Sequence, residues 1–160
     1  MQLLGAFEAS IQNRSLYFVG IEYEAREAQQ NAKAAWKKTS TDQFWEEFTL
    51  KTGGRAVWLD ADDQYLGRAA FTSLSGLKLI CMCSSKGNVQ IETKTGALNL
   101  SSLARVLSVD EPGQWFYDSR IEALLNGTFS LSEISPTSKS KEEVIRLVRE
   151  LAEPKRFQKR

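Results

Sequence analysis

The sequence of 160 residues contains no histidine, and this absence restricts the chemistry that the protein can perform. Ser-His-Asp and Cys-His nucleophile systems need an imidazole, and so do zinc sites with histidine ligands. Histidine is also the side chain whose ordinary pKa suits proton transfer near neutral pH. Any catalysis would therefore depend on carboxylates, lysine, tyrosine, serine or a thiol.

Cysteine is scarce as well, with only Cys81 and Cys83 in the chain. They lie two residues apart in an apolar segment that we expect to be a strand, so their side chains point to the same face. Two cysteines cannot form the disulfide framework of a small secreted domain. We interpret them as thiols that pack as small hydrophobic groups.

Long hydrophobic runs are missing, since no stretch approaches the ~18 apolar residues of a membrane span. The first residues show no basic region followed by an apolar run, as a secretion signal would. We therefore expect a soluble, cytoplasmic protein with no membrane partner. The 21 basic and 20 acidic residues give a net charge of +1, which argues against a protein that coats nucleic acid with its whole surface. The net charge does not exclude a local basic patch.

The length and the 42% of hydrophobic residues suit one globular domain, which we place at residues 1–153, followed by a basic tail at residues 154–160. The domain is organised around four short apolar segments: Arg55–Leu59, Tyr65–Thr72, Leu77–Cys83 and Asn88–Lys94. Spacers of four to five residues separate them, which is typical of hairpins and too short for crossover helices. We therefore predict an antiparallel meander of four strands.

The flanking segments complete the predicted fold. Alternation predicts strands at residues 5–11 and 15–23, and a stripe of alanines predicts a helix over residues 24–38. A capping box of Ser40 and Gln43 predicts a further helix that carries Phe44, Trp45 and Phe48. The fold class is thus α+β, with an antiparallel sheet of five or six strands and helices packed mainly on one face.

Three helices are predicted in the last third of the chain. One begins at about Ser101, and a short one is capped by Ser119 and Glu122 and runs through Leu125. The last begins at the capping box of Ser140 and Glu143, and Pro154 ends it.

Glu92 and Lys94 lie two apart in the last strand of the meander and project from one face. With Asp60 as a second acid, the group resembles the D…(D/E)-x-K site of the restriction-endonuclease-like nucleases. The resemblance implies a Mg²⁺ or Mn²⁺ ion held by the acids and a hydroxide oriented by the lysine. Asp62 or Asp63 could replace Asp60, and the other interpretation is a row of charges on the solvent face of a strand.

The tail carries four cations around one aromatic side chain, namely Lys155, Arg156, Phe157, Lys159 and Arg160. Such a segment can neutralise phosphates while the ring stacks on a base, and it can also dock on an acidic protein surface.

These observations favour a non-enzymatic intracellular accessory or regulatory module without a cofactor. It would engage a macromolecule, either a nucleic acid, a nucleoprotein complex or a protein, through the tail and one sheet or helix face. The alternatives are a metal-dependent nuclease and a homodimeric structural protein paired through an edge strand. Helices that join the central strands in parallel, or Glu92 facing an aspartate across an open cleft, would instead make hydrolysis the leading function.

Overall fold

The computed structural model describes residues 26–27, 30–31, 34, 45–63, 65–127 and 134–155. The two strands predicted at residues 5–11 and 15–23 lie outside these ranges. Of the helix predicted over residues 24–38, the five described residues are helical.

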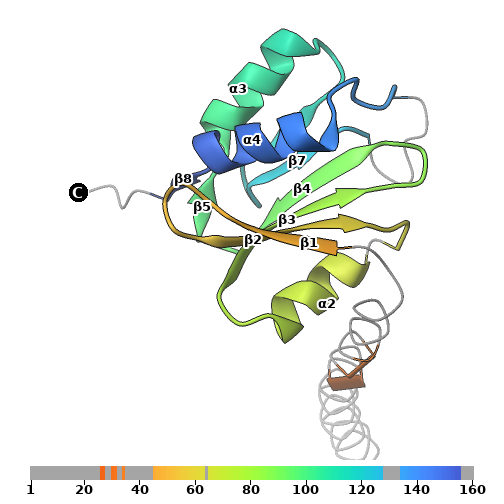
Figure 1. Ribbon diagram of the computed structural model, residues 1–160, viewed down its shortest axis with the longest axis vertical. Helices are drawn as coiled ribbons and strands as arrows, with labels where there is room; N and C mark the ends of the chain where they lie inside the picture. The colour runs from red at the N-terminus through yellow and green to blue at the C-terminus, as the bar shows by residue number, and fades with distance from the viewer. Residues whose placement is uncertain are drawn as a thin grey trace, which may run out of the picture.

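The centre of the fold is a mixed sheet of six strands (Figure 1). The strands are β1 (Trp45–Thr49), β2 (Arg55–Asp60), β3 (Leu77–Cys83), β4 (Val89–Thr93), β6 (Phe116–Asp118) and β7 (Ala123–Leu125). Their order across the sheet is β1-β2-β3-β4-β7-β6. The β2–β3 pair is parallel and the other neighbours are antiparallel. The predicted α+β class is confirmed, but the sheet is mostly rather than purely antiparallel.

The predicted meander is wrong at its second segment, because Tyr65–Ser73 forms helix α2 and not a strand. Leu66, Ala69 and Ala70 are buried at the spacing of one helix face, and the two alanines favour a helix. The helix connects β2 to β3, and a parallel pair needs such a crossover. The other three segments form β2, β3 and β4, close to their predicted bounds.

The predicted helix around Trp45 and Phe48 is also wrong, because both residues belong to β1. Their spacing of three residues suits a helix, but it also suits a strand whose two faces are both covered. Phe48 packs into the core beneath the C-terminal helices, and Trp45 packs against the cluster that contains α2. Residues 40–44 of that prediction lie outside the described ranges.

A third correction concerns residues 119–125, where a turn and strand β7 replace the predicted short helix. Glu122 has a positive φ of 50°, which no helix allows. Its carboxylate does not cap Ser119. It accepts hydrogen bonds from the Tyr117 hydroxyl at 2.5 Å and from the N–H of Leu100 at 2.9 Å, the residue that precedes helix α3 (Ser101–Asp110).

The helices predicted from Ser101 and from Ser140 are confirmed as α3 (Ser101–Asp110) and α4 (Lys141–Leu151). Ser140 accepts a hydrogen bond from the Glu143 N–H, as a capping box requires. Beyond α4, the short strand β8 (Glu153–Pro154) pairs with β5 (Leu98–Asn99). Pro154, the first residue of the predicted tail, therefore lies in a strand.

Two apolar cores lie on opposite faces of the sheet. One joins α3 and α4 to alternate residues of the strands, including Trp58 and Cys81; the other joins α2 to the residues between them, including Val57 and Ile80. In Figure 1, α3 and α4 lie above the sheet and α2 lies below it. Cys81 and the half-buried Cys83 are free thiols that contact the first core. The predicted packing of helices mainly on one face stays a prediction, because most of residues 24–38 are outside the described ranges.

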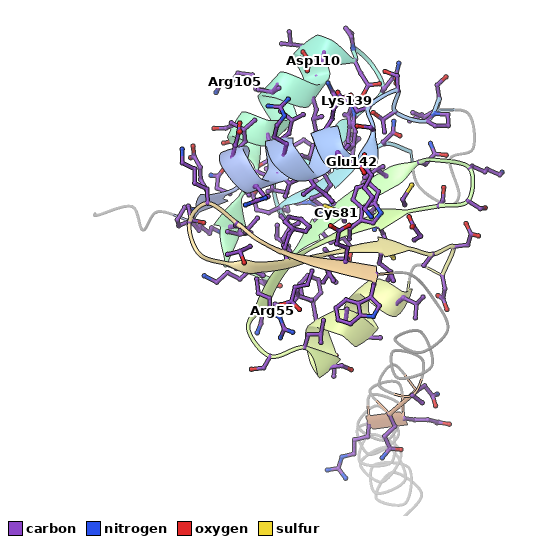
Figure 2. The ribbon with its side chains drawn as sticks, viewed as in Figure 1. Arg55, Cys81, Arg105, Asp110, Lys139 and Glu142 are labelled. Atoms are coloured by element: carbon purple, nitrogen blue, oxygen red, sulfur yellow. The ribbon has the colours of Figure 1, made fainter. Side chains whose placement is uncertain are left out.

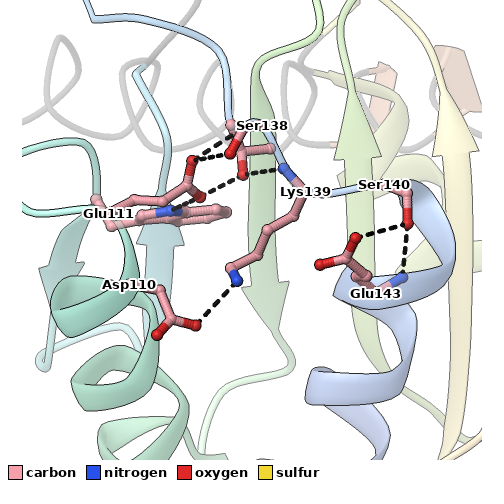
Figure 3. Close-up of polar contacts among 8 residues, drawn as sticks. Asp110, Glu111, Ser138, Lys139, Ser140 and Glu143 are labelled. Carbon is pink, nitrogen blue, oxygen red and sulfur yellow. Dashed lines mark hydrogen bonds and ion pairs between the residues drawn. The ribbon is translucent and has the colours of Figure 1, made fainter.

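The segment before α4 is fixed to the end of α3. Asp110 and Lys139 form an ion pair of 2.9 Å at this end of the molecule (Figures 2 and 3). The adjacent Glu111 is 6% exposed, and its carboxylate accepts hydrogen bonds from the Trp115 indole, the Thr137 hydroxyl and both the N–H and hydroxyl of Ser138. These bonds set the position from which α4 starts across the sheet.

None of the helices in the described ranges is both long enough and apolar enough to cross a bilayer.

Candidate functional site

The structure does not bring Asp60, Glu92 and Lys94 together. Asp60 ends β2 on the face of α3 and α4, where the Trp58 indole donates to its Oδ1 at 3.0 Å. Glu92 projects from the opposite face, because a Cβ added to Gly67 of α2 would lie 3.0 Å from its Oε2. Lys94 is exposed beyond the end of β4. The three side chains therefore cannot share one metal ion.

Glu92 is also in an environment that suits a metal ligand poorly. It is half-buried, and this burial raises the pKa of its carboxyl group. A hydrogen bond from Gln90 and the charge of Arg68 oppose this effect but do not cancel it. In addition, no three acidic or cysteine side chains in the described ranges are grouped so that they could hold a metal ion.

A small cleft of ≈ 280 Å³ lies where the parallel strands β2 and β3 end. It is lined by Asp60, Ala61, Asp62, Cys83, Ser84 and Ser85. Ligands of open α/β sheets bind at the carboxyl ends of the strands, so the position of the cleft suits a ligand.

The groups that line this cleft are largely engaged with one another. Asp62 accepts hydrogen bonds from the Ser85 N–H at 2.8 Å and from its hydroxyl at 3.0 Å. Burial raises the pKa of the Cys83 thiol, and the charges of Asp60 and Asp62 raise it further. A thiol with a raised pKa stays protonated at neutral pH and is a poor nucleophile.

A larger groove of ≈ 560 Å³ lies between β1 and α4. It is lined by Glu46, Lys51, Lys141, Glu142, Ile145, Arg146, Arg149 and Glu150. The α4 residues among them form the solvent side of the helix, with the half-buried Ile145 as their apolar member. We call this site the β1–α4 groove.

β1 contributes Glu46 to the lining of the groove, and Lys51 follows just after the strand. Leu50 donates its N–H to Gly54 across the hairpin, so main-chain groups of residues with even numbers face β2. Those of Glu47, Thr49 and Lys51 face outward by alternation. Near the hairpin, Arg149 already uses two of these groups: its Nε donates to the Thr49 carbonyl at 3.1 Å, and its carbonyl accepts from the Lys51 N–H at 3.0 Å.

These two bonds make Arg149 act like the first residue of a neighbouring strand. Toward the other end of β1, the main-chain groups of Glu47 face away from β2 by the same alternation. In the part of the chain that the structure describes, β1 has β2 as its single strand partner. The groove thus combines an outer strand edge with an adjacent helix.

Among the described residues, the ion pairs of the groove involve some of its charges and not others. Lys141 pairs with Glu46 at 2.6 Å, and Arg146 lies 3.8 Å from Glu150. Lys51 and Glu142 form no ion pair with a described residue, and Arg149 bonds to a carbonyl rather than to a carboxylate.

The binding residues predicted in the tail fall mostly outside the described ranges. Lys155 is described: it is exposed, and its N–H lies 3.5 Å from the Ala97 carbonyl beside β5. Arg156, Phe157, Lys159 and Arg160 lie outside, so the tail remains a prediction.

Comparison with known proteins identifies no family for this chain: no family model, no curated protein and no solved structure matches it.

Sequence reasoning missed the groove. The available signal was the run of charged residues on the polar side of α4, which alone does not reveal that β1 lies beside it.

Proposed function

We propose that the protein is a non-enzymatic binding module that accepts an extended segment of a partner protein as an additional strand beside β1. The observation that supports this most is that Arg149 of α4 bonds to outward main-chain groups of Thr49 and Lys51, next to a groove of ≈ 560 Å³ lined by residues of β1 and α4. In this mode of recognition, main-chain hydrogen bonds supply affinity and the adjacent side chains supply specificity.

The charge of the groove favours a protein over a nucleic acid as the partner. Carboxylates of Glu46, Glu142 and Glu150 are interspersed among its cations. Phosphates would be repelled by these acids, whereas a polypeptide can offer both signs of charge and main-chain groups for β1. The basic tail can add attraction for an acidic partner surface.

Helix α2 joins β2 and β3 in parallel and a cleft lies at their carboxyl ends, so one of the two conditions that would make hydrolysis the leading function is met. We nevertheless place hydrolysis second, because a parallel pair alone supplies no catalytic group and Asp60 and Glu92 project from opposite faces. Incubation of DNA and RNA with Mg²⁺ or Mn²⁺ tests this candidate. Cleavage that Glu92→Ala or Asp60→Ala abolishes would replace the binding function with a nuclease.

The binding function can be tested with a random nine-residue peptide library displayed on phage and selected on the full-length protein. Peptides that are enriched are then synthesised, and their affinity is measured by fluorescence anisotropy. The informative variant is Glu47→Pro, which removes an outward N–H and is tolerated at an edge strand. Glu47→Thr is the matched control, because it loses the same carboxylate and its ion pair with Arg55 but keeps the N–H.

We expect enriched peptides to bind Glu47→Pro at least about tenfold more weakly than the wild type, and Glu47→Thr within about twofold. Melting curves establish that both variants are folded. If the library yields no peptide above the level of the bare support, or if both variants bind equally, the proposal is wrong.

The same variants test the homodimer alternative. A full-length chain that light scattering shows to be a dimer, and that Glu47→Pro converts to a monomer, would assign the edge of β1 to a second copy. The binding of a separate partner there would then be excluded.

A further inference from the structure

We infer that the β1–α4 groove is electrically polarised and selects a segment with an acidic residue at the hairpin end and a basic residue at the other end. This inference rests on the proposed function and adds to it the charge pattern of the partner. It is carried by the positions of Lys51, Arg149 and Glu142, whose charges have no opposite partner among the described residues.

The positive end lies where β1 enters its hairpin. Lys51 and Arg149 are linked there by the bond between the Lys51 N–H and the Arg149 carbonyl. Arg149 uses Nε to bind Thr49, and this bond fixes the guanidinium beside the edge of β1, while its two terminal nitrogens make no hydrogen bond to a described residue. Both side chains are exposed, so a carboxylate can reach them from solvent. A planar guanidinium next to an ammonium is a suitable site for a carboxylate.

The negative end lies at the first turn of α4. Glu142 is exposed there, and Glu46 adds a second carboxylate that is already paired with Lys141. Figure 2 shows Glu142 on α4. A cation from the partner would meet the Glu142 carboxylate, which forms no ion pair with a described residue. Lysine and arginine are the residues that supply such a cation.

The spacing of the two ends predicts the spacing of the charges in the partner. Glu142 and Arg149 are seven residues apart on α4, which at 1.5 Å per residue is about 10 Å. An extended chain covers about 3.3 Å per residue, so the acid and the base in the partner should be about three to four residues apart. The α4 axis follows β1, because Lys141 lies beside Glu46 and Arg149 beside Thr49.

The charge pattern is tested by charge reversal and a repeat of the library selection. Lys51→Glu reverses the positive end, and its N–H bond to Arg149 does not need the side chain. Lys86→Glu is the matched control, an exposed lysine in the turn between β3 and β4. We expect peptides from the wild-type selection to carry an acid and a base at the predicted spacing. Lys51→Glu should weaken them by about fivefold and select peptides that lack the acid. Lys86→Glu should change neither result.

The outcomes separate the two proposals. If peptides bind the wild type and Glu47→Pro weakens them, but no acid is enriched and Lys51→Glu changes nothing, the polarity is wrong and the binding function stands. If no peptide binds the wild type, both proposals are wrong. If a single-stranded oligonucleotide binds in place of peptides, with an affinity that falls steeply with salt and with Lys51→Glu, the groove is a phosphate site and both are wrong.

Discussion

Two carboxylates show how differently this fold treats one type of residue. Glu111 and Glu92 are both removed from bulk water, and burial alone would raise the pKa of each. At Glu111, hydrogen bonds from Thr137, Ser138 and Trp115 outweigh burial, and the pKa is lowered. At Glu92, the hydrogen bond from Gln90 is not sufficient, and the pKa is raised. The two residues therefore make opposite contributions to the pH dependence of stability.

Replacing Glu111 by glutamine should lower the free energy of unfolding at pH 7 by about 2 kcal/mol, because a charged acceptor of several hydrogen bonds becomes neutral. The lowered folded pKa means that this contribution is fully present above the unfolded value of 4.5 and is lost as the pH falls below it. Urea denaturation of both proteins at pH 7 and pH 3 measures the difference, which should shrink at pH 3. Glu150→Gln, in an exposed pair, should cost less than ~0.5 kcal/mol. If Glu111→Gln lowers the free energy of unfolding by no more than Glu150→Gln does, Glu111 does not stabilise the fold through its charge.

Glu92→Gln should change the pH dependence of stability in the opposite direction to Glu111→Gln. A raised folded pKa gives a contribution that is present below the unfolded value of 4.5 and is lost as the pH rises through the folded pKa. The glutamine variant does not titrate, so its melting temperature relative to the wild type should be higher at pH 7 than at pH 4. A relative melting temperature that is equal at the two pH values, or higher at pH 4, would show that burial does not govern Glu92.

At the scale of the elements, the first turn of α4 starts directly after the segment that Glu111 holds by hydrogen bonds to Ser138 (Figure 3). Ser140→Ala removes the acceptor for the Glu143 N–H and should cost about 1 kcal/mol. The matched control is Ser119→Ala, in the exposed turn between β6 and β7, which should be nearly neutral. Thermal and urea denaturation measure both. Equal effects of the two substitutions would show that the capping box does not stabilise α4.

Local patterns predicted some elements and misled at others for identifiable reasons. The capping box and apolar stripe of α4 are both local, so its start was predictable. Helix α2 was missed because its apolar run and short spacers also suit a hairpin strand, and only its pair of alanines indicated a helix. The match of Ser119 and Glu122 to a capping box was accidental, because Glu122 instead binds Leu100, which is distant in the sequence.

At the scale of the whole molecule, the candidate site could not be predicted, because it depends on contacts between distant parts of the chain. Arg149 binds Thr49 across 100 residues, and no periodicity in the sequence indicates that pairing. The parallel β2–β3 pair likewise follows from the path of α2, and the register of β2, β3 and β4 places Asp60 and Glu92 on opposite faces. What the sequence did indicate correctly at this scale is the α+β class of the fold.

Binding of a partner strand requires that the outer edge of β1 is open in the free protein, and amide hydrogen exchange measured by NMR on the full-length chain tests this most directly. The main-chain N–H of Phe48 faces β2, and the main-chain N–H of Glu47 faces outward. The Glu47 amide should therefore exchange at least about a hundredfold faster than the Phe48 amide. Similar slow exchange at both positions would mean that the edge is already paired, by residues 1–44 or by a second copy. The groove could not then accept a partner strand.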